Sequence, residues 1–236
     1  MISEQLAEIR RRISEAACSA GRNPAEITLV AATKTQSAET VRAAIAAGIT
    51  ICGENRVQEM AEKLDAFAYD HASLHFIGHL QTNKVKQVVG RVDCIESIGS
   101  LHLLEAVNEC AARLELVQDI LLQVNIGREP QKSGVLPEDV PDLVQAAGKA
   151  GHVRLRGLMC VPPAGCNSEE NRQFFGAVRQ LFIDTQGKIS DNERLGMTHL
   201  SMGMSSDFED AIREGATLVR VGSALFGPRT YHTSES

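Results

Sequence analysis

Two sets of residues in this sequence could carry out chemistry: a lysine at the end of an apolar run, and small polar residues near the C-terminus. Lys34 closes the run 27–34, where an ammonium group is costly to bury unless it is paired or loses its proton. Partial burial lowers the pKa of a lysine below its reference value of about 10.4, and the free amine then attacks aldehydes. A lysine that reaches the rim and stays solvated is the alternative.

The second set occupies two turns rich in Gly and Ser. Ser201 and Ser205 belong to the first turn, and Gly222 and Ser223 to the second. Gly222 lets a ligand approach the backbone, and Ser223 begins a short helix whose free N–H groups can bind an anion. The sequence therefore predicts a phosphate site, although two ordinary capped turns have the same composition. Arg220 is a charge within the last apolar run, and we expect it to point at a ligand or a carboxylate.

Two further patterns have more than one interpretation. Asn55 follows the run 50–53 and could either bind a ligand oxygen or cap the next helix. His71, His75 and His79 are four residues apart, which on a helix would resemble a metal site. Residues 74–78 have a strand pattern, however, and four residues of strand span about 13 Å. We therefore predict no metal site.

The elements that must position these residues alternate regularly. Eight short, β-branched runs cover 27–33, 50–53, 74–78, 92–96, 117–125, 153–159, 198–201 and 218–221. Helical patterns lie between them, at 38–47, 58–67, 82–89, 101–114, 138–150, 169–186 and 207–214, after an amphipathic helix at 3–20. Nearly continuous apolar strands indicate a parallel sheet, and eight of them favour an α/β fold of the (β/α)8 TIM-barrel type.

An open, doubly wound sheet is the alternative fold, but no glycine-rich dinucleotide turn follows the first strand. We expect one barrel domain over residues 1–230 and a disordered tail at 231–236. Because the active sites of such barrels lie at the carboxyl ends of the strands, the two sets of residues should meet there.

Composition excludes several functional classes. The chain has 236 residues, 43% of them hydrophobic, and a formal net charge of -6 without a basic block, so nucleic acid is not an expected partner. No apolar run approaches the length of a bilayer span, so no membrane association is expected. The six cysteines form no CxxC pair, which argues against a disulfide framework and fits the reducing cytoplasm.

Seven segments together resemble the pyridoxal phosphate homeostasis protein family, of the YggS/PROSC type, through nearly the whole chain. The matching segments are 29–34, 53–59, 75–84, 132–134, 157–159, 200–207 and 219–227. The resemblance implies a fold-type III barrel, similar to the N-terminal domain of alanine racemase, with pyridoxal 5′-phosphate (PLP) held as a Schiff base on Lys34. Two positions depart from the family pattern: Ser223 replaces the usual Thr, and Gly99 stands where Asp is common.

The same resemblance implies that Arg220 faces the pyridine nitrogen. It places Ser201, Ser205, Gly222 and Ser223 around the phosphate. A guanidinium cannot accept the proton of the ring nitrogen and stays charged, whereas PLP enzymes work best as electron sinks when that nitrogen is protonated. Arg220 would therefore keep the nitrogen unprotonated.

Racemases of this fold also use a tyrosine from an added β-domain of the partner subunit. The tyrosines here are Tyr69, outside the strand ends, and Tyr231, in the tail, and the chain ends after the last strand. We therefore expect a monomeric PLP carrier that regulates cellular PLP, without a catalytic residue, and with PLP-dependent apo-enzymes as candidate recipients. A PLP-dependent amino-acid racemase using Lys34 alone is the alternative. A barrel that forms a Schiff base with a sugar is the third possibility.

Overall fold

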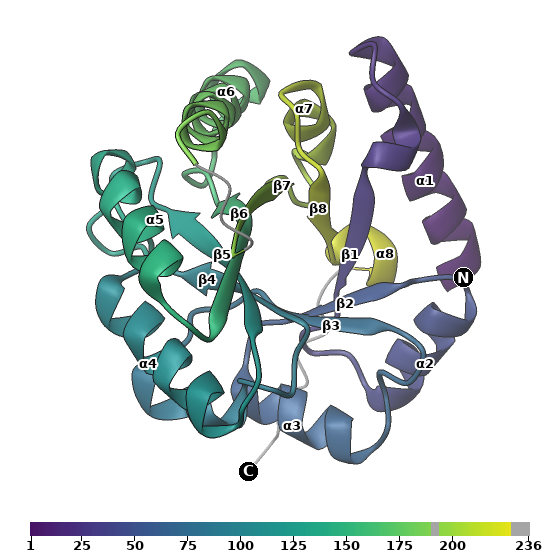
Figure 1. Cartoon of the computed structure of the whole chain (residues 1–236). Coiled ribbons are helices and arrows are strands. Elements are labelled where there is room, and N and C mark those ends of the chain that lie inside the picture. The colour runs from purple at the N-terminus through teal and green to yellow at the C-terminus, as the bar shows by residue number, and fades with distance from the viewer. Residues whose placement is uncertain (190–193, 228–236) are drawn as a thin grey trace.

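Eight parallel strands close into a barrel with helices around it in the computed structural model (Figure 1). The structure describes residues 1–189 and 194–227, so the predicted tail at 231–236 lies outside the described residues. Each strand pairs with the next in the chain, and β8 closes the barrel against β1. The strands are β1 (Thr28–Ala32), β2 (Ile51–Glu54), β3 (Ser73–Phe76), β4 (Cys94–Ile98), β5 (Gln118–Val124), β6 (Val153–Cys160), β7 (Leu195–Ser201) and β8 (Leu218–Val221). The predicted (β/α)8 fold is confirmed.

Helices follow the strands and cover the outside of the barrel (Figure 1). The α-helices are α1 (Ile2–Ser19), α2 (Ala38–Ala46), α3 (Val57–Asp65), α4 (Leu101–Arg113), α5 (Val140–Lys149), α6 (Ser168–Gln186), α7 (Phe208–Arg213) and α8 (Ser223–Phe226). Short 3₁₀ helices are η1 (Pro24–Glu26), η2 (Thr82–Gln87) and η3 (Pro137–Asp139). Within residues 1–189 and 194–227, no helix combines the length and apolar character that a bilayer span requires.

The alternation of side chains along each strand separates two apolar layers. A small cluster inside the barrel contains Val30, Cys94, Leu121, Met159 and Leu218, all buried. Residues of the opposite parity, such as Ala31, belong to the larger core between the barrel and the helices. Because successive residues of a strand point to opposite faces, the position of Val30 fixes the direction of every side chain at the end of β1.

The segment between β3 and β4 differs from its prediction. The sequence predicts an α-helix over 82–89, whereas the structure has the 3₁₀ helix η2. Val85, Val88 and Val89 are all buried there. β-Branched side chains favour an α-helix only weakly, and the spacing of Val85 and Val88 matches the three-residue turn of a 3₁₀ helix.

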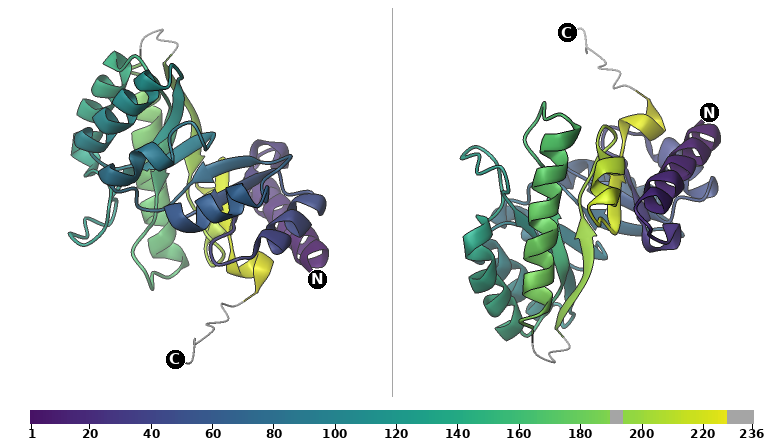
Figure 2. Two further views of the ribbon diagram at one scale, coloured as in Figure 1. Left: turned by 90° about the horizontal axis from the view of Figure 1, so that it is seen from below. Right: turned by 90° about the horizontal axis from the view of Figure 1, so that it is seen from above.

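The extra N-terminal helix is confirmed. Helix α1 packs beside α7, α8 and α2 along one side of the barrel (Figure 2). It buries the predicted apolar face, which includes Leu6, Ile9 and Ile13. Arg12 on this helix makes two hydrogen bonds of 3.0 Å to Glu209 of α7, which tie the helix to the barrel.

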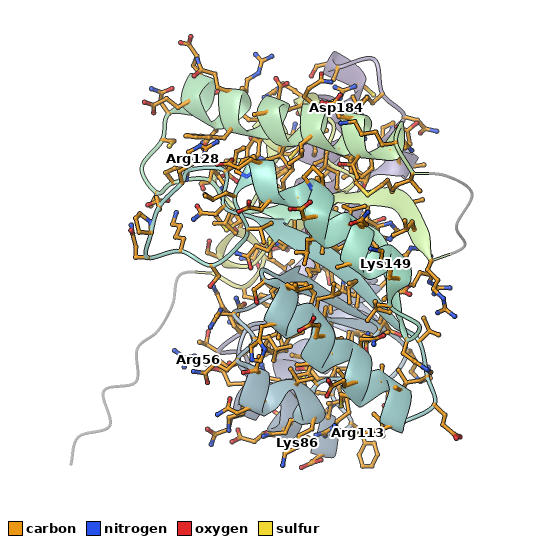
Figure 3. All side chains as sticks on the ribbon, turned by 60° about the vertical axis from the view of Figure 1, so that its left-hand side comes forward. Arg56, Lys86, Arg113, Arg128, Lys149 and Asp184 are labelled. Atoms are coloured by element: carbon orange, nitrogen blue, oxygen red, sulfur yellow. The ribbon has the colours of Figure 1, made fainter. Side chains whose placement is uncertain are left out.

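Labelled side chains mark the two ends of the barrel in Figure 3. Figure 3 shows Arg56 and Arg128, which follow β2 and β5, at one end, and Arg113 and Lys149, in the last turns of α4 and α5, at the other. The first of these is the carboxyl end of the strands, where Lys34, Asn55 and the two Gly/Ser turns also follow their strands. The fold therefore brings the predicted site residues to one end of the barrel.

Candidate functional site

A cavity of about 300 Å³ opens at the carboxyl ends of the strands. Its volume falls within the usual range of small-molecule sites. Six of the seven predicted site residues line it, and they come from the turns after β1, β2 and β7, and from β8 and the turn that follows it: Lys34, Asn55, Ser205, Arg220, Gly222 and Ser223. The seventh, Ser201, is fully buried and contacts Arg220.

Lys34, two residues after the end of β1, lines the cavity on the side that the alternation along this strand predicts. Val30 and Ala32 face the inside of the barrel, as Lys34 then must, whereas Thr33 faces the helices. The hydroxyl of Thr33 donates to Oε1 of Glu54 over 2.6 Å on that outer side. Lys34 itself is partly buried, as the sequence predicts.

A buried polar cluster on the outer side holds the backbone next to Lys34. Oε1 of Glu54 accepts hydrogen bonds from Thr33, from Nζ of Lys63 over 2.6 Å and from the Tyr69 hydroxyl over 2.9 Å. Nζ of Lys63 also donates to the carbonyl of Thr33 over 2.7 Å. Burial and the adjacent Glu54 carboxylate raise the pKa of Tyr69 well above its ordinary value. Tyr69 is therefore a structural donor outside the barrel.

The residue after Lys34 has an unusual backbone conformation. Thr35 has φ +65°, a region that a β-branched residue rarely adopts. Its N–H donates to Oε2 of Glu59 over 2.7 Å. This hydrogen bond and the Lys63 bond to Thr33 fix the chain on both sides of Lys34.

The two Gly/Ser turns meet at Ser205. Its Oγ accepts hydrogen bonds from the N–H of Gly222 over 3.1 Å and from that of Ala224 over 3.3 Å. A Cβ at position 222 would lie 3.3 Å from both the Cβ and the carbonyl oxygen of Ala32, which is a tight approach. The absence of a side chain keeps this wall of the cavity open, with two backbone donors converging on one oxygen.

Arg220 forms the floor of the cavity and is 4% exposed. Its Nη1 donates to Oγ of Ser201 over 2.6 Å, and its Nη2 donates to the carbonyl of Cys160 over 2.8 Å. Ser201 pairs with Leu218 in the barrel, two residues before Arg220, so it lies one layer deeper. Arg220 thus contacts a hydroxyl and a backbone carbonyl, and it reaches the Glu96 carboxylate only through Ser201. That it points at a ligand stays a prediction.

Below Ser201 the hydrogen bonds continue to Glu96, which is fully buried. The Ser201 hydroxyl donates to Oε2 of Glu96 over 2.6 Å, and Nδ1 of His75 lies 2.7 Å from Oε1. Burial raises the pKa of Glu96, but the hydrogen bonds from His75 and Ser201 and the charge of Arg220 outweigh it and hold that pKa below its ordinary value. Glu96 is therefore an ionised carboxylate inside the barrel.

Asn55 supplies an acceptor that none of the described residues uses. Its Oδ1 is enclosed and has no hydrogen-bond partner among the described residues. Gly78 permits this arrangement, because a Cβ there would lie 2.1 Å from the backbone oxygen of Asn55. Enclosed polar atoms without partners are rare in proteins, so this oxygen indicates a donor on a ligand.

Comparison with known proteins identifies the family. The alanine racemase N-terminal domain family matches residues 5–230. The pyridoxal phosphate homeostasis protein of Aquifex aeolicus is 40% identical over 228 residues, covering 97% of this chain and 98% of that protein. The chain belongs to the pyridoxal phosphate homeostasis protein family. The family resemblance of the sequence is thereby confirmed.

Solved structures agree with this assignment. PipY of Synechococcus elongatus, in a structure with PLP bound, has a TM-score of 0.83 and 33% identity, covering 96% of this chain and 100% of that chain. Alanine racemase of Clostridium difficile has a TM-score of 0.71 at 14% identity, and this chain covers 58% of it. The second likeness concerns the fold alone.

The sequence did not reveal the residues that support the site. Glu96 could have been noticed as a charge inside an apolar strand, and Lys63 as a lysine three residues after Met60 on the apolar face of its helix. Their partners on other elements are not visible in the sequence. His75, considered above only as a metal ligand, is instead the partner of Glu96.

Proposed function

We propose that this protein binds PLP as a Schiff base on Lys34 and releases it by exchange with other amines, as a carrier in PLP homeostasis. The observation that supports this most strongly is the shared cavity of about 300 Å³: it is lined by a partly buried amine, a Gly/Ser turn with a backbone donor, an asparagine with an unused acceptor, and a buried guanidinium. In PLP, the amine would meet the aldehyde, the Gly/Ser turn the phosphate, the asparagine the ring hydroxyl, and the guanidinium the ring nitrogen. PLP supplies the reactive aldehyde.

Gly222, Ala224 and Ser205 form the proposed phosphate end of the site. Their N–H and hydroxyl groups already converge, and a phosphate oxygen is a stronger acceptor for backbone donors than a neutral hydroxyl. Ser223 lines the same wall. Ser201, which the resemblance places at the phosphate, does not line the cavity. It is fully buried one layer deeper and hydrogen-bonds Glu96 and Arg220, so it is not among the proposed phosphate contacts.

Asn55 and Arg220 form the proposed ring end of the site. Oδ1 of Asn55 can accept a hydrogen bond from the ring hydroxyl, which would give this enclosed oxygen a partner. Arg220 has five N–H groups in one plane, and two of them are used by Ser201 and Cys160. The remaining donors suit an unprotonated pyridine nitrogen.

Binding without turnover is part of the proposal. A racemase moves a proton on both faces of the α-carbon and needs two acid/base groups. Among the described residues that line the cavity, Lys34 is the one side chain able to exchange a proton near neutral pH, since arginine stays charged. Tyr69 is engaged with Glu54, and Tyr231 lies outside the described residues.

We also propose that the protein acts as a monomer in the cytoplasm and that PLP-dependent apo-enzymes receive its PLP. The six cysteines are free in the structure, which fits a reducing compartment. Gel filtration at several protein concentrations tests the monomer. Transfer to an apo-enzyme is tested by its gain of activity upon mixing.

An absorbance spectrum tests the central proposal. Protein incubated with PLP and freed of excess should keep a visible Schiff-base band. Lys34→Ala should lose it, and Lys86→Ala, which changes an exposed lysine on η2, should keep it. A band of equal height in Lys34→Ala would overturn the proposal.

Exchange of the α-hydrogen separates the carrier from a racemase. The loaded protein should incorporate little deuterium into a panel of amino acids in heavy water. Robust exchange that disappears in Lys34→Ala would favour the racemase.

A further inference from the structure

Four buried polar side chains form one hydrogen-bonded chain under the cavity, and the proposed ligand contacts use only its last member. His75 of β3, Glu96 of β4, Ser201 of β7 and Arg220 of β8 are between 0% and 6% exposed. The links measure 2.7, 2.6 and 2.6 Å from His75 to Arg220. Burying charged groups costs free energy, so charged side chains inside the barrel suggest a functional role.

We propose that Glu96 is a positioning residue for the ligand ring: its charge offsets that of Arg220 and thereby sets the proton affinity of the Schiff base on Lys34. This inference rests on the proposed function. It goes beyond it by assigning a role to a residue that does not line the cavity.

The direction of each hydrogen bond in the chain is fixed. An ionised carboxylate only accepts, so the Ser201 hydroxyl gives its single proton to Glu96, and its oxygen is left to accept from Arg220. Nδ1 of His75 must likewise carry a proton toward Glu96. Were Glu96 neutral, one of these bonds would lose its acceptor.

The orientation of Arg220 follows from that direction. Ser201 holds Nη1, and the carbonyl of Cys160 holds Nη2. Two bonds to a planar group fix its plane, and therefore the line along which its free N–H groups enter the cavity. The Ser201 bond in turn depends on Glu96, which makes Glu96 the anchor of the guanidinium.

The charge of Glu96 acts over a longer range. Inside the barrel the effective dielectric constant is far below that of water, so the guanidinium and the carboxylate are both felt at the Schiff base. A protonated Schiff base is a cation. With Glu96 ionised, the negative charge of Glu96 offsets most of the repulsion between Arg220 and the protonated Schiff base. Without the Glu96 charge, that repulsion is uncompensated, and the Schiff base loses its proton more easily.

Other charged and titratable groups face the same part of the interior from neighbouring strands. Cys94 of β4 interacts with Glu96, and His199 of β7 interacts with Glu96 and His75. Asp119 of β5 and Arg156 of β6 interact with both Cys94 and His199. Burial and the charge of Arg156 lower the pKa of His199, so His199 is neutral near pH 7 and does not offset Arg220. Asp119 is paired with Arg154. A second buried carboxylate, Asp207, also interacts with Arg220, but burial raises its pKa and its Oδ1 accepts from the N–H of Met204. Glu96 is the carboxylate that a chain of hydrogen bonds links to Arg220.

The experiment is a pH titration of the visible band between about pH 5 and 10 in PLP-loaded protein. Glu96→Gln keeps the shape of the side chain and removes its charge. Taking about 10 Å between that charge and the Schiff base and an effective dielectric constant of about 20, the midpoint should fall by about one pH unit, a tenfold loss of proton affinity.

A matched control is Glu209→Gln on the outer surface of the barrel. Glu209 is also a carboxylate held by two hydrogen bonds from an arginine, Arg12. The change should lower stability without moving the midpoint. Coincident titration curves for Glu96→Gln and the wild type, whether or not a midpoint is reached, would overturn the inference.

A second comparison covers the case in which Glu96→Gln does not fold. Arg220→Gln keeps the Glu96 charge without the guanidinium, and the double variant Arg220→Gln/Glu96→Gln removes both buried charges, which proteins tolerate better than one charge left alone. Adding the Glu96 change to Arg220→Gln should lower the midpoint by about one pH unit. No difference between these two proteins would contradict the inference. A wild type without any visible band would contradict the proposed function itself, so the two failures are distinguishable.

Discussion

The buried ion pair between Lys63 and Glu54 gives a quantitative prediction for the support of Lys34. Nζ of Lys63 lies 2.6 Å from Oε1 of Glu54, and the two side chains are 8% and 0% exposed. Lys63→Met retains most of the hydrocarbon stem and removes the charge, so the Glu54 carboxylate stays buried without its cation. Removing one partner of a buried pair costs about 3–5 kcal/mol.

Urea unfolding at pH 7 measures this cost as a change in the free energy of unfolding. Lys149→Met, an exposed lysine at the end of α5, is the matched control and should cost less than about 0.5 kcal/mol. The double variant Lys63→Met/Glu54→Gln should recover at least half of the loss, because no charge is then left buried alone. A single-variant cost below about 1 kcal/mol, or a double variant no more stable than the single one, would refute the reasoning.

Three further predictions concern the cavity and the N-terminal helix. Ser205→Ala should weaken PLP binding by about tenfold, as loss of one charge-assisted hydrogen bond, and leave binding of phosphate-free pyridoxal unchanged; equal losses for both ligands in a fluorescence titration would contradict this. Asn55→Ala should leave the unfolding free energy within about 0.5 kcal/mol, because its Oδ1 has no partner in the part of the chain that the structure describes, yet weaken PLP binding several-fold. The hydrogen bond from Arg12 lowers the pKa of Glu209, so their bond stabilises the fold above the unfolded-state pKa of Glu209 and is lost as the pH falls through its folded value. Arg12→Met should therefore lower the free energy of unfolding by at most about 1 kcal/mol at pH 7, because solvent screens this partly exposed pair, and by less at pH 3. A loss of stability that grows as the pH falls would contradict this.

The barrel and the position of Lys34 could be predicted because their signals are local. Each strand is a short apolar run, and parity along β1 sends Lys34 to the same side as Val30. The carboxyl ends of the strands of a barrel meet at one end, so Lys34, Asn55 and the two Gly/Ser turns had to converge. The structure places six of these predicted residues around one cavity.

The supporting network could not be predicted because its partners are distant in the chain. Glu96 and Ser201 are 105 residues apart and meet only through closure of the barrel. Lys63 occupies an apolar face of α3, where a charge makes sense only once Glu54 is known to lie opposite. In the segment at 82–89, apolar spacing fits a 3₁₀ helix and an α-helix almost equally, and tertiary packing selected the former.

Peptide mapping after borohydride reduction tests the central claim most directly. Reduction converts a Schiff base into a stable amine, which mass spectrometry locates on a single residue. We predict that the pyridoxyl-phosphate group is found on the peptide that contains Lys34. A pyridoxyl-phosphate group on another lysine, with Lys34 unmodified, would contradict this proposal.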